Sequence, residues 1–315
     1  MLIELLIFAG LCLCLYLLVM SSDIFVDNAT ALGSAFRVSP FLVGFFLVAL
    51  GTSLAELFSS VVAVIRGSSE FVLGNVVGSN IANIGFILGI SVISAHVYRF
   101  RFTVDRKSIK QDAFFAGLSL LLLVIIVALG NIGYVHGLIL LGFLAIVSYL
   151  ILTNPSHMPE MSATHFSWKY VALLIFSGIG LYLFAEGTIY TITLLVDRFS
   201  FLTDSAFIAL TVVAFGTSLP ELSVSFSALK KKQFTLILGN VLGSNMFNIL
   251  LVVGASALFG SLVISHSILF FALPVLIVMT LLMFLFMYTD KKLELWEGVV
   301  LLALYCAFIA GLFFV

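Results

Sequence analysis

Long apolar runs separated by short polar connections cover the whole of this 315-residue chain. Ten of these runs are long enough to cross a bilayer, since a helix needs about 20 apolar residues to span the hydrocarbon core. They lie at 2–20, 40–65, 71–97, 113–129, 133–153, 167–195, 205–229, 234–260, 266–288 and 295–314. The runs lack the alternation of barrel strands, so the pattern predicts an all-α polytopic membrane protein with ten transmembrane helices.

Composition agrees with this fold class and excludes several functions. Hydrophobic residues make up 63% of the chain and charged residues 9%, which no soluble globular domain tolerates. The net charge of −1 argues against a nucleic-acid partner. The first run carries Glu4, has no basic residues before it and ends without a small-residue cleavage site, so it is predicted to be a retained helix rather than a signal peptide. The connection 154–166 is too short for a soluble regulatory domain.

Basic residues divide unevenly between alternate connections. Only Arg66 and Arg198 lie on one set of connections. The other set carries twelve of the 14 Lys and Arg residues: Arg37, Arg99, Arg101, Arg106, Lys107, Lys110, Lys169, Lys230, Lys231, Lys232, Lys291 and Lys292. Because short cytoplasmic loops are rich in Lys and Arg, the second set is predicted to be cytoplasmic, with both termini extracytoplasmic in a cell membrane.

One polar pattern occurs twice. The block at 49–84 contains ALGTSLAE and GNVVGSNIAN, and the block at 214–249 contains AFGTSLPE and GNVLGSNMFN. The two blocks are identical at 18 of 36 positions, and they align without a gap. The chain is therefore an internal duplication, predicted as one five-helix repeat at 1–153, a short loop at 154–166 and a second repeat at 167–315.

The two repeats are predicted to cross the membrane in opposite directions. Glu56 lies in the second run and Glu221 in the seventh, and five spans is an odd number. Inverted-topology repeats are typical of secondary transporters, which place their substrate site near the midplane where the repeats meet.

Helical spacing gathers the polar residues into stripes. Residues four apart share a helix face, which aligns Thr52, Glu56 and Ser60 on one helix. Similar stripes follow in the rest of the two blocks: Asn75, Ser79 and Asn83; Thr217, Glu221 and Ser225; and Asn240, Ser244 and Asn248. Four such stripes are predicted to face a common interior rather than lipid.

Carboxylate, amide and hydroxyl oxygens are the ligands that hard cations such as Ca²⁺ prefer, whereas zinc or copper favours nitrogen or sulfur. The alternative is that Glu56 and Glu221 are only structural, but an acidic side chain at membrane depth costs about 2.5–3.5 kcal/mol. Glycines at 51, 74, 78, 216, 239 and 243, with Pro220, are predicted to unwind the helices locally and release carbonyl oxygens, or to allow close helix packing.

The paired motifs resemble the α-repeats of the sodium/calcium exchangers, within the calcium/cation antiporter superfamily. The resemblance covers the whole chain and implies Ca²⁺/Na⁺ antiport by alternating access, with no enzymatic activity and no cofactor beyond the transported ions. It implies four central cation sites, one for Ca²⁺ and the flanking ones for Na⁺. It also implies that the first and sixth helices slide together across the other eight. The residues that it implies as cation ligands are Ala49, Thr52, Ser53, Glu56, Ser79, Asn83, Ala214, Thr217, Ser218, Glu221, Ser244 and Asn248.

Two positions depart from the family pattern. Ala55 stands where Pro220 stands in the second repeat, and Asn248 stands where several relatives carry aspartate. A proton-coupled cation antiporter of the same superfamily is the main alternative. That branch typically places an acid just after the Gly-Asn pair, where this chain has Val76 and Val241. A cation channel is a further alternative, but inverted repeats favour alternating access over a continuous pore.

Overall fold

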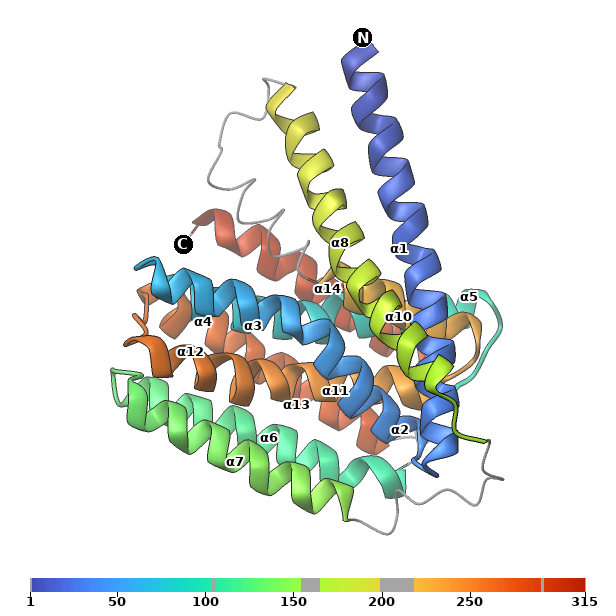
Figure 1. Ribbon diagram of the computed structural model, residues 1–315. Helices are drawn as coiled ribbons and strands as arrows, with labels where there is room; N and C mark the ends of the chain where they lie inside the picture. The colour runs from blue at the N-terminus through green and yellow to red at the C-terminus, as the bar shows by residue number, and fades with distance from the viewer. Residues whose placement is uncertain (1, 104–105, 154–164, 199–217, 290–291, 315) are drawn as a thin grey trace.

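The computed structural model describes residues 2–103, 106–153, 165–198, 218–289 and 292–314, and these are almost entirely helical (Figure 1). The α-helices are α1 (Leu2–Ala35), α2 (Pro40–Leu42), α3 (Ala49–Ile65), α4 (Glu70–Ala82), α5 (Gly89–Val97), α6 (Arg106–Ala128), α7 (Tyr134–Leu152), α8 (Trp168–Arg198), α10 (Leu219–Lys230), α11 (Phe234–Phe247), α12 (Gly254–Phe259), α13 (Leu273–Thr289) and α14 (Leu295–Gly311). Four π-helical segments, η1 (Val43–Val48), η2 (Asn83–Leu88), η4 (Asn248–Val253) and η5 (Ile268–Ala272), join some of them, and η6 (Leu312–Phe314) is a short 3₁₀ turn.

The helices confirm the predicted membrane fold. Among the described residues, seven continuous helices are long and apolar enough to span a bilayer: Leu6–Ala35, Pro40–Ile65, Glu70–Val97, Tyr134–Leu152, Trp168–Leu194, Phe234–Phe259 and Ile268–Tyr288. Two shorter apolar helices, Asp112–Ala128 and Leu295–Gly311, match two more predicted spans. The span predicted at 205–229 is described only from residue 218 onward, where α10 begins at Leu219.

Two predicted boundaries were wrong. The first helix was predicted to end at 20 but continues to Ala35, and α6 begins at Arg106 instead of 113. The first span was predicted to end before Ser21 because the polar residues Asp23, Asp27 and Asn28 follow and interrupt the apolar run. The helix continues because these polar residues find partners: Ser22 and Asp23 hydrogen-bond to α10, and Asn28 donates to the carbonyl of Ile24.

The loops gather at two ends of the helix bundle. At one end, the strand β1 (Phe102–Thr103) pairs antiparallel with β2 (Lys292–Leu293), Lys232 lies over the ring of Phe100, and Phe36 contacts Phe166. An isolated bridge between Ile132 and Leu262 joins two loops of the other set. The connections rich in Lys and Arg therefore meet at one end, as the alternating topology requires.

Two long helices stand apart from a central bundle. Figure 1 shows α1 and α8 running side by side and extending beyond the other helices. Small residues allow this contact, since a β-carbon at Gly180 would lie 2.6 Å from the Oγ of Ser21. In the bundle, 94% of the most apolar window of the Phe234–Phe259 span is buried, and 78% of that of the Glu70–Val97 span. The two predicted stripes that end at Asn83 and Asn248 therefore run through the best-covered helices.

Candidate cation site

The two repeated glutamates lie inside the membrane-spanning bundle. Glu56 is in the middle of α3 and Glu221 is in the first turn of α10, and each side chain is only 1% exposed. The two carboxylates are close enough to interact electrostatically. Both glutamates therefore lie on buried helix faces, as their four-residue spacing from other polar residues predicted.

The second motif of each repeat places its serine and its asparagine at equivalent helix positions. Ser79 and Asn83 lie at the end of α4 and the start of η2, and Ser244 and Asn248 occupy the same places on α11 and η4. Asn83 and Asn248 each begin a π-helical segment. Such segments are rare and are often found at functional sites. η2 packs against α10 and η4 against α3, so each asparagine begins a segment beside the helix that carries the other repeat's glutamate.

Many buried oxygens in this region have no protein partner. Both carboxylate oxygens of Glu56 and of Glu221 lack a hydrogen-bond partner among the residues that the structure describes. The same holds, within those residues, for one oxygen on each of Ser53, Ser79, Asn83, Ser218, Ser244 and Asn248. Since buried polar atoms are almost always paired in proteins, so many unpaired oxygens in one region indicate a site for a positively charged ligand.

Threonine and alanine of the first motif have a different environment. The hydroxyl of Thr52 donates along its own helix, to the carbonyl of Val48 at 3.2 Å or of Ala49 at 3.3 Å. Its oxygen also lies near the carboxylate of Glu221. The carbonyl of Ala49 is thus partly occupied by Thr52. The predicted ligands Ala214 and Thr217 lie outside the described residues.

The predicted unwinding at the glycines was wrong where the chain can be followed. Gly51, Gly74 and Gly78 lie inside continuous helices, as do Gly239 and Gly243. Close packing explains two of them, because a β-carbon at Gly239 would lie 2.3 Å from the carbonyl oxygen of Phe41 and one at Gly243 would lie 2.4 Å from that of Phe45. Gly216 lies outside the described residues. At Pro220 the chain does begin a helix, whereas at Ala55 the helix α3 continues unbroken.

Sequence reasoning missed the asparagines that follow the motif serines. Asn80 and Asn245 are 0% and 7% exposed, and they form a reciprocal set of hydrogen bonds between the two repeats. It also missed the buried repeat-equivalent serines Ser91 and Ser256. Each pair is related by the same offset that relates Glu56 to Glu221, and this signal in the sequence would have drawn attention to all four.

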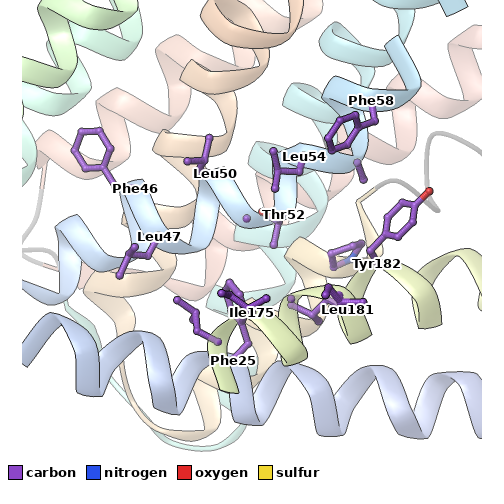
Figure 2. A pocket seen from close by; sticks show the side chains of 16 residues that line it. Phe25, Phe46, Leu47, Leu50, Thr52, Leu54, Phe58, Ile175, Leu181 and Tyr182 are labelled. Atoms are coloured by element: carbon purple, nitrogen blue, oxygen red, sulfur yellow. The ribbon is translucent and has the colours of Figure 1, made fainter. Parts of the chain in front are cut away.

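Two adjoining cavities connect the site region to the outside of the bundle. One has a volume of about 510 Å³, lies between α1, α3 and α8, and reaches Thr52 and Pro220. The other, of about 240 Å³, lies between α3 and α8 and is lined by Phe58, Ser59 and Glu186 among others. Figure 2 shows Thr52, Leu54 and Phe58 from α3 across the first cavity from Leu181 and Tyr182 on α8.

Within the described part of the chain, three or more His, Cys, Asp or Glu residues nowhere come together as a metal-binding group. The acids of the site number two, and the other buried oxygens come from amides and hydroxyls. This ligand chemistry suits an alkali or alkaline-earth cation rather than a transition metal.

Known proteins are similar to this chain in both sequence and architecture. The family model for the sodium/calcium exchanger protein matches residues 6–153 and 169–314. The sodium/calcium exchanger MaX1 of Methanosarcina acetivorans is 33% identical, over 98% of this chain and 99% of its own. An uncharacterised membrane protein of Methanocaldococcus jannaschii, MJ0091, is also 33% identical, over 95% of each chain.

A solved structure of the sodium-calcium exchanger NCX_Mj, soaked with 2.5 mM Na⁺ and 10 mM Sr²⁺, superimposes with a TM-score of 0.85 at 30% identity. The match covers 98% of this chain and 99% of that one. The family model matches each of the two repeats, and the helical fold is that of the solved exchanger. The chain belongs to the sodium/calcium exchanger family.

Proposed function

We propose that this protein is a secondary active antiporter that exchanges Ca²⁺ for Na⁺ across a cell membrane by alternating access. The observation that carries the proposal is the pair of buried glutamates. Neither carboxylate forms an ion pair with a described residue, and neither has a close hydrogen-bond partner there, the neutral hydroxyl of Thr52 lying near Glu221. A buried anion without a protein partner is costly, so the balancing positive charge must come from bound ions or protons.

Glu56 and Glu221 are assigned as the central ligands, because they are the charged members of the unpartnered set. The hydroxyls of Ser53 and Ser218, the amide oxygens of Asn83 and Asn248, and the main-chain and side-chain oxygens of Thr52 and Thr217 add neutral ligands around them. Ser79 and Ser244, with the carbonyls of Ala49 and Ala214, are assigned to the flanking Na⁺ sites. Ca²⁺ takes about six to eight oxygens in flexible geometry, and this inventory is large enough.

The cavities support an access route to this site. They lie beside α3 and α8 and reach Thr52 and Pro220, one residue from Glu221. By the distribution of basic residues, the smaller cavity lies in the extracytoplasmic half of α3 and α8, where both termini are also placed, whereas the larger cavity extends to Phe46 and Leu174 toward the cytoplasmic side. Relatives whose names describe sodium/calcium exchange agree with the proposed ions.

The test is ⁴⁵Ca²⁺ uptake into proteoliposomes loaded with Na⁺ and diluted into choline medium. Uptake that depends on the outward Na⁺ gradient and saturates with Ca²⁺ is expected. Glu56→Gln and Glu221→Gln each remove one charge from the shared site, and each is expected to reduce uptake to the level of empty liposomes. Glu70→Gln is the matched control, because Glu70 is an exposed carboxylate in the first turn of α4.

Different failures of this experiment have different meanings. Uptake driven by a pH gradient but not by Na⁺ would replace Na⁺ with H⁺ as the coupling ion. Non-saturating flux without counter-transport would indicate a channel. Full activity of either glutamine variant would assign that carboxylate a structural role only.

A further inference from the structure

Four asparagine side chains form a ring of hydrogen bonds where the two repeats meet. Asn80 Nδ2 donates to the main-chain carbonyl of Asn245 at 3.1 Å, and Asn245 Nδ2 donates to the main-chain carbonyl of Asn80 at 3.3 Å. Asn83 Nδ2 donates to Asn245 Oδ1 at 2.9 Å, and Asn248 Nδ2 donates to Asn80 Oδ1 at 3.1 Å. Every bond crosses from one repeat to the other, so the ring has the same pseudo-two-fold symmetry as the sequence.

The ring has a fixed direction. A main-chain carbonyl can only accept a hydrogen bond, so the side-chain amides of Asn80 and Asn245 must each turn their nitrogen toward it. Their Oδ1 atoms then face Asn248 and Asn83, which must present their own nitrogens. The remaining Oδ1 atoms of Asn83 and Asn248 are buried and have no hydrogen-bond partner among the described residues.

Orientation matters because the two ends of an amide have opposite polarity. The oxygen can bind a cation, whereas the NH₂ group can only donate and repels one. If packing alone holds an asparagine, its side-chain amide can turn over and exchange its oxygen for its nitrogen, because the two groups have nearly the same size. A cation site built with asparagine therefore needs a second group that excludes the wrong orientation.

We propose that Asn80 and Asn245 are positioning residues that hold Asn248 and Asn83 with their amide oxygens, rather than their nitrogens, available to the transported cation. This inference rests on the proposed function and names residues outside the set of predicted ligands. The same four bonds tie the end of α4 to the end of α11, so the two middle helices keep one relative position while the ligands are held.

The test is equilibrium ⁴⁵Ca²⁺ binding to purified protein, which does not depend on turnover. Asn245→Ala removes the acceptor that holds the Asn83 amide, and the dissociation constant for Ca²⁺ is expected to rise about threefold to tenfold, the range of one lost hydrogen bond. Asn80→Ala, acting on Asn248, is expected to have the same effect by symmetry. Ser119→Ala is the control, because this buried hydroxyl bonds only within its own helix, to the carbonyl of Phe115 at 2.8 Å, and Ca²⁺ binding is expected to be unchanged.

A second background separates positioning from a general structural role. In Asn83→Asp protein both ends of the side chain are oxygens, so no wrong orientation exists, and the Oδ1 of Asn245 is a neighbour that repels the carboxylate. Asn245→Ala is therefore expected to leave Ca²⁺ binding unchanged or to strengthen it in this background. The matching pair for the other arm is Asn80→Ala in Asn248→Asp protein.

Two outcomes would overturn the inference. One is equal weakening of Ca²⁺ binding by Asn245→Ala in the wild-type and Asn83→Asp backgrounds, which would mean that Asn245 only stabilises the fold. The other is unchanged binding in Asn245→Ala and Asn80→Ala proteins. If the wild-type protein binds no Ca²⁺ in the same assay, the proposed function itself fails. If Asn245→Ala protein does not fold, the test is decided by Asn80→Ala in the wild-type and Asn248→Asp backgrounds.

Discussion

Two interfaces that the duplication makes equivalent differ sharply in this structure. The helix α1 packs on α10, and its counterpart α8 faces α3, the counterpart of α10. The first, closed interface is crossed by hydrogen bonds and an ion pair, whereas the second, open interface lines cavities of about 510 Å³ and 240 Å³, the larger of which also reaches Phe25 on α1 and Pro220 on α10. Corresponding helices of the two repeats therefore meet through different contacts, although both interfaces derive from one duplicated pattern.

The closed interface is held by several hydrogen bonds and one ion pair. The hydroxyls of Ser22 and Ser223 lie 2.8 Å apart, and Ser227 donates to the carboxylate of Asp23 at 2.5 Å. Lys231 donates to the main-chain carbonyl of Asp23 at 2.8 Å and pairs with Asp27 at 2.7 Å. These contacts fix the position of α1 at the end of the bundle where the basic loops meet.

The open interface has no equivalent polar contacts among its described residues. On α8, this interface is lined by Tyr182, Ala185, Glu186 and Ile189. The counterparts of Ser223 and Ser227 on α3 are Phe58 and Val62, and only Arg66 keeps the basic character of Lys231. If the repeats exchange conformations during transport, as inverted repeats do, α8 closes on α3 through apolar contacts while the polar contacts of α1 break.

The largest expected effect comes from locking the closed interface. In protein whose native cysteines are replaced by alanine, Ser22→Cys combined with Ser223→Cys places two thiols within disulfide range, because the two hydroxyls are already in contact. Oxidation is expected to reduce Na⁺-driven ⁴⁵Ca²⁺ uptake by at least about tenfold, since alternating access requires the interface to open. Reducing agent is expected to restore uptake.

A pair across the second interface is the control for this lock. Phe58→Cys combined with Glu186→Cys is expected to form a disulfide only while substrate ions drive turnover, because both side chains line a cavity between α3 and α8 in the present state. Full exchange by the oxidised Ser22→Cys, Ser223→Cys protein would show that α1 does not move relative to α10.

Labelling tests whether the two interfaces lie at opposite faces of the membrane. Arg66 and Lys231 directly follow α3 and α10 and occupy equivalent positions. Arg66→Cys is expected to react with an impermeant thiol reagent from the extracytoplasmic side and Lys231→Cys from the cytoplasmic side. Reaction of both from one side would contradict the inverted topology on which the comparison rests.

Removing the ion pair at the closed interface is expected to have a small effect. The side chains of Lys231 and Asp27 are 26% and 66% exposed, so solvent screens their attraction, and such pairs contribute about 0–1 kcal/mol. Asp27→Asn is expected to change the half-saturating Ca²⁺ concentration on the two sides in opposite directions, each by less than about fivefold. An unchanged half-saturation on both sides would mean that the hydrogen bonds of Asp23 and Ser223 hold the interface alone.

No effect is expected from removing K⁺. Asn83 and Asn248 are neutral, so Glu56 and Glu221 are the fixed charges of the proposed site, and one Ca²⁺ balances them. A further K⁺ would leave excess positive charge in a low-dielectric region, where Coulomb interactions are several-fold stronger than in water. Uptake is measured with K⁺ replaced by choline on both sides and the voltage controlled by other means. A collapse of uptake without K⁺ would refute this charge count, and Asn248→Asp is the companion variant, expected to alter cation preference.

The sequence by itself determined the membrane class, the positions of most spans and the chemistry of the site. It could do so because the bilayer imposes a local rule: each span must be apolar, so an acid or amide repeated inside a span is conspicuous. The pairing of Glu56 with Glu221 and of Asn83 with Asn248 followed from the gapless alignment of the two blocks alone.

Only the tertiary structure decided which polar atoms are already satisfied and which are available. The hydrogen bonds between Asn80 and Asn245 join residues from opposite halves of the chain, and so do the contacts of α1 with α10. The difference between the two interfaces likewise depends on which helix of one half meets which helix of the other. Helical periodicity carries no information about such contacts, because it reports which face of a helix is polar but not what that face meets. The glycines illustrate the limit: their sequence allowed either unwinding or close packing, and the neighbouring carbonyls of Phe41 and Phe45 decided for packing at Gly239 and Gly243.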